Sequence, residues 1–447
     1  MGRESIYEGR NSIIICIISS IFVVLKMYTG NNIFLLIFLL LTSAGILFDR
    51  IEYKFEYLLF FISWVYVLKF QYSDFSLFIF LSAMYIFICI IYMLIHNSKL
   101  EIKFLLGYML FAAYVITIPL VGGSSLTTVL GFLLNYTLLF FAVSFVKNNR
   151  LFGRYIRMYA LGLLLSSFIR LISYKIPDLN QYFISMTEIY TLIVGGKLNI
   201  RFAGADIDPN YYSIQILLAI SCLLVSIYYD KERKNISVLL CMMLSVLGFL
   251  SLSKMYLIVF LFLVILALIS FSRNNIKVGI KFTLSILLCG GVVAFFAFDY
   301  LYSSYFQRFV GSGQGFTGLT TGRSEIWQMF LSDITFDMRV LILGVGYGAV
   351  SLNDTMAHNS YLTGLYYMGI IGTIITLIYF NTIRENLIIE SKNKKRFKIL
   401  SVNNIPLLTL LLANFSLDSF VMEYFPIHLF LVIFALNYNG YTKHQMI

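Results

Sequence analysis

AHNSYLTGLYYMGIIGTIITLIYF, residues 357–380, decides the fold of this chain. A polar start leads into an apolar run of about 20 residues, long enough to cross the hydrocarbon core of a bilayer as a helix. His358 and Asn359 stand at the beginning of that run. Because ionisable residues are costly beside lipid, a histidine at this position indicates function. The stretch therefore predicts a membrane helix that begins at a functional polar end.

The rest of the chain is built in the same way. Of its 447 residues, 60% are hydrophobic and only 12% are charged, whereas soluble domains average about 25% charged residues. We expect an all-α, polytopic integral membrane protein with about fourteen transmembrane helices, as a single membrane domain over residues 1–447. The expected spans lie near residues 12–28, 31–48, 57–70, 75–95, 104–121, 125–146, 158–173, 211–229, 236–252, 255–271, 279–298, 359–380, 400–417 and 420–437.

The net charge of +11 is explained by topology. With the amino terminus in the cytoplasm, the basic clusters at 147–157, 231–234, 273–281 and 381–399 fall inside, and the long segment 299–358 falls outside with only three arginines. This asymmetry is what the positive-inside rule requires. The sequence thus predicts a multi-pass membrane protein with both termini cytoplasmic, and it argues against a nucleic-acid partner.

Two loops on the outer face are long enough to hold a site, residues 174–210 and 299–358. The first ends in RFAGADIDPNYYS (201–213), where Asp208 fits a helix N-cap and Pro209 the first helical position. Free N–H groups at this helix start, together with Arg201, suit an anion such as phosphate. In the alternative interpretation, Arg201 only reaches to the interface and Asp208 only caps the helix.

Asp206 and Asp208 also form a D-x-D pattern, which many sugar transferases use to hold a divalent cation. The pattern is very short, and Asp208 already has a role as a cap. We therefore favour a metal-independent protein with no cofactor.

The second loop contains TTGRSEIWQMFLSDI (320–334), in which apolar residues recur at helical spacing. This predicts a short amphipathic helix lying at the interface, with Arg323 at its start and Trp327 one turn on. The planar fork of Arg323 suits bidentate phosphate contacts, whereas Trp327 is typical of an interfacial anchor. The following LGVGYGA (343–349) matches a dinucleotide-binding pattern, but without a strand–turn–helix unit its glycines are expected to shape a turn.

His358 is the one histidine of four that stands at an expected outer helix start. There the helix dipole disfavours the imidazolium, so the ring stays neutral and can accept a proton. An interfacial histidine without function is the alternative. His428 falls in an apolar span and is expected to be a packed residue, while His96 and His444 fall in cytoplasmic segments.

Three further residues near the outer face are weaker candidates. Lys254 follows two serines at a tight turn, and either a substrate contact or an interfacial position explains it. Asp418 and Glu423 lie near the outer end of the last spans, where the sequence alone does not fix a role for them.

In motif order, the chain resembles the O-antigen polymerase and O-antigen ligase superfamily of bacterial envelope glycosyltransferases. The resemblance covers residues 200–372. It is carried by Arg201, Gly204, Pro209, Asn210, Gly322, Arg323, Trp327, His358, Asn359, Gly369 and Gly372.

The resemblance implies a GT-C-like fold and a periplasmic active site that joins oligosaccharide repeat units carried on undecaprenyl pyrophosphate. By position, Arg201 and Arg323 would clamp the pyrophosphate, and His358 would activate the acceptor hydroxyl. Asn210, Lys254, Trp327 and Asn359 would bind substrate. The implied partners are the lipid-linked donor and acceptor, membrane lipids, a chain-length regulator and a flippase.

Polymerase and ligase differ in the acceptor, which is a lipid-linked repeat unit for a polymerase and lipid A core for a ligase. The number of expected spans and the aromatic composition favour the polymerase. A lipid-linked oligosaccharide flippase or other transporter stays an alternative, although the candidate residues cluster at one surface rather than at mid-bilayer.

Overall fold

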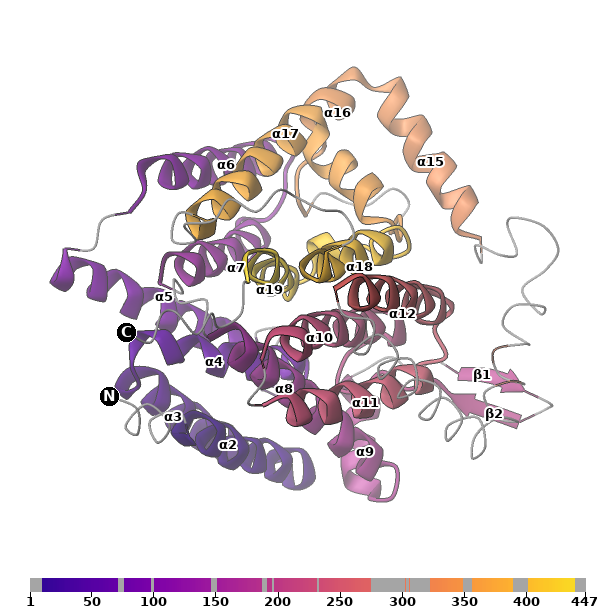
Figure 1. Ribbon diagram of the computed structural model, residues 1–447. Helices are drawn as coiled ribbons and strands as arrows, with labels where there is room; N and C mark the ends of the chain where they lie inside the picture. The colour runs from indigo at the N-terminus through magenta and orange to yellow at the C-terminus, as the bar shows by residue number, and fades with distance from the viewer. Residues whose placement is uncertain are drawn as a thin grey trace.

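The computed structural model describes residues 10–70, 76–97, 100–145, 151–186, 191–194, 197–230, 233–274, 302, 305, 322–348, 356–388 and 401–438 (Figure 1). Their helices are α2 (Arg10–Thr29), α3 (Ile33–Phe48), α4 (Ile51–Phe61), α5 (Leu77–His96), α6 (Ile102–Val121), α7 (Leu126–Phe145), α8 (Phe152–Ser173), α9 (Pro177–Met186), α10 (Pro209–Tyr229), α11 (Lys234–Leu250), α12 (Lys254–Asn274), α15 (Arg323–Phe336), α16 (Met338–Leu343), α17 (Ser360–Ile388), α18 (Ile405–Ala413) and α19 (Phe425–Asn437). Short 3-10 turns lie at η1 (Ile62–Trp64), η4 (Val402–Asn404) and η5 (Ser419–Val421).

The helical membrane architecture expected from the sequence is confirmed. In the described part of the chain, eight helices are long and apolar enough to cross a membrane, namely α2, α5, α6, α7, α8, α10, α12 and α17. Four shorter apolar helices, α3, α11, α18 and α19, accompany them. The expected span 279–298 lies outside the described residues, so the total of about fourteen spans stays a prediction.

The segment 174–210, expected as a loop, contains secondary structure of its own. It holds α9 and a hairpin of two antiparallel strands, β1 (Thr191–Val194) and β2 (Lys197–Ile200), with Val194 paired to Lys197. These are the only strands among the described residues. The β-branched residues of TLIV and the final isoleucine of KLNI favour extended backbone. Both strands are too short to stand out as long apolar runs.

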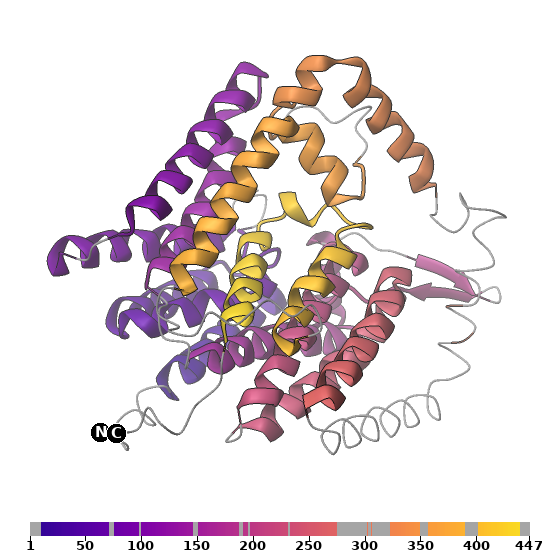
Figure 2. The ribbon, with the colours of Figure 1, turned by 45° about the horizontal axis from the view of Figure 1, so that its top comes forward.

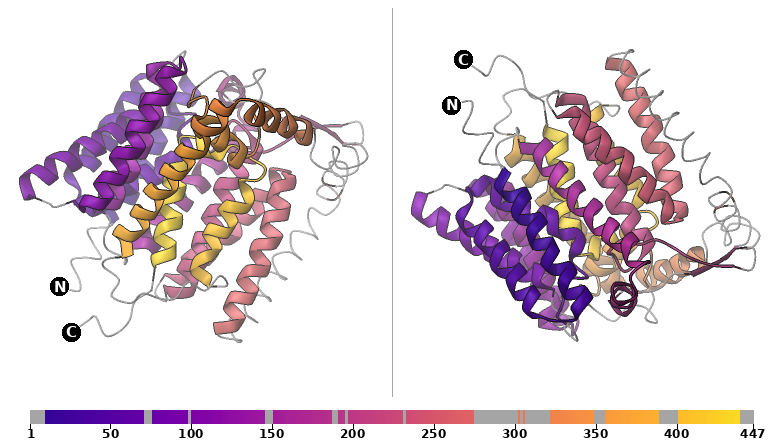
Figure 3. Two further views of the ribbon diagram at one scale, coloured as in Figure 1. Left: turned by 90° about the horizontal axis from the view of Figure 1, so that it is seen from above. Right: turned by 90° about the horizontal axis from the view of Figure 1, so that it is seen from below.

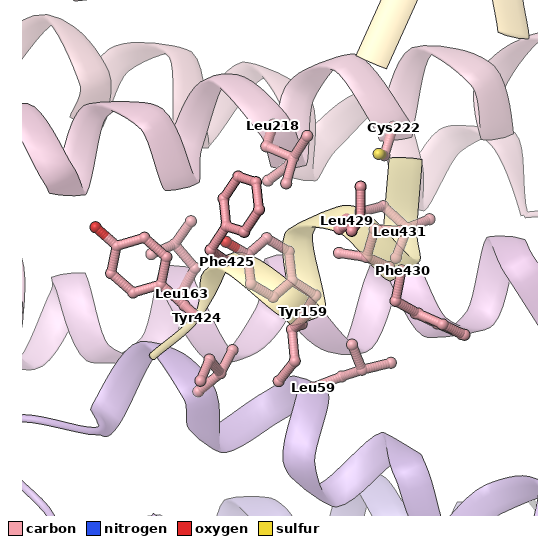
Figure 4. Packing of buried hydrophobic residues seen from close by; sticks show 14 of the residues in the cluster. Leu59, Tyr159, Leu163, Leu218, Cys222, Tyr424, Phe425, Leu429, Phe430 and Leu431 are labelled. Atoms are coloured by element: carbon pink, nitrogen blue, oxygen red, sulfur yellow. The ribbon is translucent and has the colours of Figure 1, made fainter. Parts of the chain in front are cut away.

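The carboxy-terminal helices lie in the middle of the bundle. Figures 2 and 3 show α17, α18 and α19 between the violet amino-terminal helices and the red helices α10–α12. Almost every residue of α10 and α19 is buried. Figure 4 shows side chains of α4, α8, α10 and α19 meeting in this interior. His428 of α19 is fully buried there and shares a 2.8 Å hydrogen bond with the Tyr159 hydroxyl, so its predicted packed position is confirmed.

Helix α17 is interrupted at Gly369, whose φ of 59° is non-helical. A Cβ atom there would lie 2.5 Å from the backbone carbonyl carbon of Ile342, because α16 packs directly against the break. At Gly372 a Cβ would lie 2.4 Å from the Tyr114 ring. The Tyr114 hydroxyl donates to the carbonyl oxygens of Leu343 and Met368, both at 2.8 Å. The two glycines therefore let α6 and α16 approach α17 closely.

Candidate functional site

The two long segments singled out in the sequence meet at one end of the bundle. This end, where α10, α15 and α17 begin, is called the site end. Arg323 at the start of α15 interacts electrostatically with Asp208 at the start of α10. His358, just before α17, interacts with both. Residues far apart in the sequence are thus gathered around three helix N-termini, where the helix dipole favours anions.

The start of α10 is built as predicted. Asp208 is the N-cap residue, and its side chain accepts hydrogen bonds from the backbone N–H groups of Asn210 at 2.5 Å and Tyr211 at 3.3 Å. Pro209 occupies the first turn. Such a cap contributes about 1 kcal/mol to helix stability, and it fixes where α10 begins.

Arg201 is buried against this first turn. Its Nη2 donates to the Asn210 side-chain oxygen at 3.0 Å, and its Nε donates to the carbonyl oxygen of Ser251 at 3.2 Å. The same Asn210 oxygen accepts from the Ser253 hydroxyl at 2.8 Å. Because Lys254 is the first residue of α12, directly after Ser253, the sequence-predicted Arg201, Asn210 and Lys254 come together at the site end.

Arg323 is held by the segment between α18 and α19. Its Nη1 donates to the carbonyl oxygen of Ser416 at 2.6 Å. Burial lowers the pKa of the Arg323 guanidinium, while the nearby carboxylates of Asp208 and Asp418 oppose this shift. An arginine retains its charge under such conditions, so a cation remains near the start of α10.

The backbone of His358 is held by Asp418. One carboxylate oxygen of Asp418 accepts from the His358 N–H at 2.6 Å, and the other accepts from the Asn359 N–H at 2.7 Å and from the Thr363 hydroxyl. His358 has a φ of 50°, in the left-handed region that side chains rarely adopt. Asp418 thus fixes a strained turn directly before α17.

Asn359 and Trp327 complete this turn. The Asn359 side-chain oxygen accepts from the N–H groups of Tyr361 at 3.0 Å and Leu362 at 3.3 Å, which caps α17. The Trp327 indole N–H donates to the carbonyl oxygen of Ala357 at 2.8 Å. Both side chains therefore position His358, and their contact with substrate stays a prediction.

The His358 imidazole is neutral at pH 7. Burial lowers the pKa of His358 below its usual value, and the positive charge of Arg323 lowers it further, whereas Asp418 and Asp208 act in the opposite direction. Burial is the largest of these influences. Its Nδ1 atom is buried and has no hydrogen-bond partner among the described residues. The ring can therefore receive a proton from a bound molecule.

The two carboxylates of the D-x-D pattern are used in different ways. Burial raises the pKa of the Asp206 carboxyl to about 8, against hydrogen bonds from the N–H groups of Asp208 and Ile207. Asp206 is therefore mostly protonated at pH 7, and Asp208 caps α10.

No group of three or more histidine, cysteine or acidic residues that could hold a metal ion occurs in the described part of the chain. Independence of a metal stays a prediction.

The glycines of LGVGYGA shape a turn, as expected. Gly344 and Gly346 have positive φ angles of 75° and 94°. The N–H groups of Val345 and Gly346 donate to the carbonyl oxygens of Tyr366 and Tyr367, both at 2.9 Å. This turn joins the end of α16 to the outer part of α17, and Ala349 lies outside the described residues.

Two residues of the site could not be found from the sequence. Asp418 was an acidic residue without a defined role, because its partners lie about 60 residues earlier in the chain. The Tyr211 hydroxyl, within electrostatic range of Asp418, Asp208 and Arg323, is buried and has no hydrogen-bond partner among the described residues. The sequence offers one sign of a site here, namely the several polar residues in the run 416–424.

No protein-family model matches the chain, and no curated protein matches it either.

Proposed function

We propose that this protein is an O-antigen polymerase-like glycosyltransferase that joins oligosaccharide units carried on undecaprenyl pyrophosphate. The proposal rests on the resemblance of the Arg201, Arg323 and His358 motifs and on the site that these residues share. The observation that carries it is the neutral, half-buried His358 beside the charged Arg323 at three helix N-termini. This arrangement offers a base and an anion site side by side.

In the proposed reaction, an acceptor hydroxyl oxygen attacks the anomeric carbon of the donor sugar. The bond between that carbon and the phosphate oxygen breaks, and undecaprenyl pyrophosphate leaves with the electron pair. Arg323 and Arg201 stabilise the negative charge that develops on the leaving group. The proton of the hydroxyl passes to the neutral His358 ring.

Electrostatics favour this division of roles. The positive charge of Arg323 lowers the pKa of His358, which keeps the ring unprotonated before the reaction. When an anionic pyrophosphate binds Arg323, this effect weakens and His358 becomes a better proton acceptor. Substrate binding would thereby prepare the base.

The site would face the periplasm of a bacterial inner membrane. The basic clusters that the positive-inside rule assigns to the cytoplasm include Arg154, Arg157 and Arg233, which stand at the starts of α8 and α11. Those helices begin at the end of the bundle opposite the site end, since α11 follows the end of α10 and Arg157 of α8 pairs with Asp230 there at 2.7 Å. A periplasmic site is also where lipid-linked repeat units are joined in the family that the chain resembles.

The test is His358→Ala in the native host, with lipopolysaccharide separated on gels and protein level matched by immunoblot. We expect lipid A core that bears a single repeat unit, the pattern of a polymerase defect. Bare core with accumulated lipid-linked polymer would instead identify a ligase, the second candidate. An unchanged ladder at equal protein level would overturn the proposal.

A transporter is the less favoured alternative. Transporter sites lie near the bilayer midplane, between the helices. Here Arg201, Arg323 and His358 gather at the starts of helices instead, at the site end of the bundle.

A further inference from the structure

A second polar group of side chains lies next to the candidate site. It consists of Tyr66, Lys69, Tyr347 and Glu423, which we call the aromatic subsite. All four residues are partly exposed, although they sit among buried neighbours such as Val67, Leu68 and Tyr424. They come from the segment after η1, the turn after α16 and the segment between η5 and α19. None of them takes part in the mechanism described above.

The aromatic subsite connects directly to the candidate site through Tyr66. Tyr66 interacts electrostatically with Asp206 and Tyr211 of the site and with Glu423 and Tyr347 of the subsite. Tyr211 in turn lies within electrostatic range of Asp418, the residue that holds His358. Tyr66 and Tyr211 therefore link the aromatic subsite to the residues around His358.

The side chains of this group are held in place. The Tyr66 hydroxyl donates to the Met422 sulfur at 3.9 Å, and the Tyr347 hydroxyl donates to the carbonyl oxygen of Val421 at 3.3 Å. The Tyr347 ring stacks on Phe132 with 4.0 Å between ring centroids. Lys69 Nζ lies 5.8 Å from the centre of the Tyr66 ring. Such fixed rings lose little conformational entropy when a ligand binds.

Two buried hydroxyls beside the subsite need partners. The hydroxyls of Tyr211 and Tyr424 are buried and have no hydrogen-bond partner among the described residues. Tyr424 interacts electrostatically with Tyr66 and Tyr211. Buried polar atoms of this kind are usually satisfied by water or by a ligand. This second observation, independent of the aromatic rings, leaves two buried hydroxyls available for hydrogen bonds to a ligand.

The chemistry of the subsite fits a sugar. Aromatic rings offer apolar faces against which the C–H faces of a sugar ring pack, and a carboxylate accepts hydrogen bonds from hydroxyl groups. Burial raises the pKa of the Glu423 carboxyl, and the positive charge of Lys69 opposes this shift. Because Lys69 stands beside the rings, a cationic ligand is disfavoured.

We propose that Tyr66, Tyr347 and Glu423 bind the acceptor glycan, as a hydroxyl-rich unit whose attacking oxygen then reaches His358. This inference rests on the proposed function and adds to it the residues that select the acceptor. It separates the roles of the two regions: the arginines would recognise the pyrophosphate of the donor, and the aromatic subsite would recognise the sugars of the acceptor.

The test measures binding of a glycan that lacks pyrophosphate. The probe is the free oligosaccharide of one repeat unit, released from the polysaccharide of the host by partial hydrolysis. Its binding to the purified full chain in detergent is followed by saturation-transfer NMR. Glu423→Gln and Tyr66→Phe are compared with Glu385→Gln, which changes an exposed glutamate near the far end of α17. Thermal unfolding of each variant in the same detergent verifies folding.

We expect Glu423→Gln to weaken binding about 10-fold, the effect of one lost hydrogen bond of about 1.4 kcal/mol, and Tyr66→Phe, which keeps the ring, to weaken it by less. Glu385→Gln should bind like the wild type. Equal binding by all three folded variants would overturn the subsite and leave the proposed function standing. If the wild type does not bind the oligosaccharide, the acceptor subsite is refuted, and the gel pattern of His358→Ala in the host decides separately on the proposed function.

Discussion

Asp418 accepts the backbone N–H of His358 at 2.6 Å, and this bond joins the segment before α19 to the start of α17. The second carboxylate oxygen accepts the N–H of Asn359 at 2.7 Å. Each oxygen therefore satisfies a different backbone donor. The pair holds His358 in its left-handed conformation and so sets the direction of the imidazole.

We predict that Asp418→Asn weakens both folding and activity. An asparagine offers one acceptor oxygen for two N–H groups, and a buried donor left without a partner costs about 1–3 kcal/mol. The free energy of unfolding in detergent should fall by that amount, and polymer formation in the host should fall with it. Asp337→Asn is the matched control, because the Asp337 carboxylate accepts one backbone N–H among the described residues, that of Arg339 at 2.8 Å, and lies at an exposed position. Equal unfolding free energies for both variants would contradict this account.

The pH dependence of transfer should report on Arg323. The pKa of His358 is lowered by burial and by Arg323, so the neutral, reactive ring persists below pH 6.5 and activity should fall only in more acidic solution. Arg323→Gln removes a charge that lowers this pKa, and the acidic limb of the pH–rate profile should move to higher pH. The exposed Arg339→Gln removes the same charge from α16 and should leave the limb in place. A limb that shifts equally in both variants would argue against direct coupling.

The Asp206 carboxyl should make stability fall as pH rises. Its pKa is about 8 in the folded protein, against about 3.9 in an unfolded chain. The stability that its protonated form contributes is complete below about pH 4 and is lost progressively as pH rises through 8. We expect the unfolding temperature of the wild type to decrease more between pH 6 and pH 9 than that of Asp206→Asn. An equal decrease in both proteins would show that Asp206 is ionised in the folded state across this pH range.

Two glycines of α17 form a matched pair for mutation. Gly369→Ala should destabilise the protein, because a Cβ at a φ of 59° is strained and would meet the backbone of Ile342 at 2.5 Å. The expected loss is about 1–3 kcal/mol. Gly364→Ala should be harmless, since a Cβ there has nothing within 4 Å. Denaturation of the two variants in detergent gives the comparison, and equal stability would mean that the break in α17 is not required.

Much of the fold follows from local sequence signals. Apolar runs mark helices because a membrane helix must satisfy its own backbone, and the cap at Asp208 follows from residues 208–209 alone. The partners of Arg201 and Arg323 could not be predicted, since Ser251 and Ser416 lie 50 and 93 residues away. The role of Asp418 could not be predicted for the same reason. Its role depends on how α17 packs against the segment before α19, which no short pattern encodes.

The break at Gly369 divides α17 into two parts that have different neighbours. The lower part, from Gly369 to Ile388, packs against α6 and α7, where the Tyr379 ring is buried beside Phe104 and Tyr136. The upper part, from Ser360 to Met368, is fastened to α16 through the Tyr366 and Tyr367 carbonyls and to Asp418 through its first turn. The two parts of α17 are thus held by different neighbours, and His358 adjoins the part that is fixed at the site end.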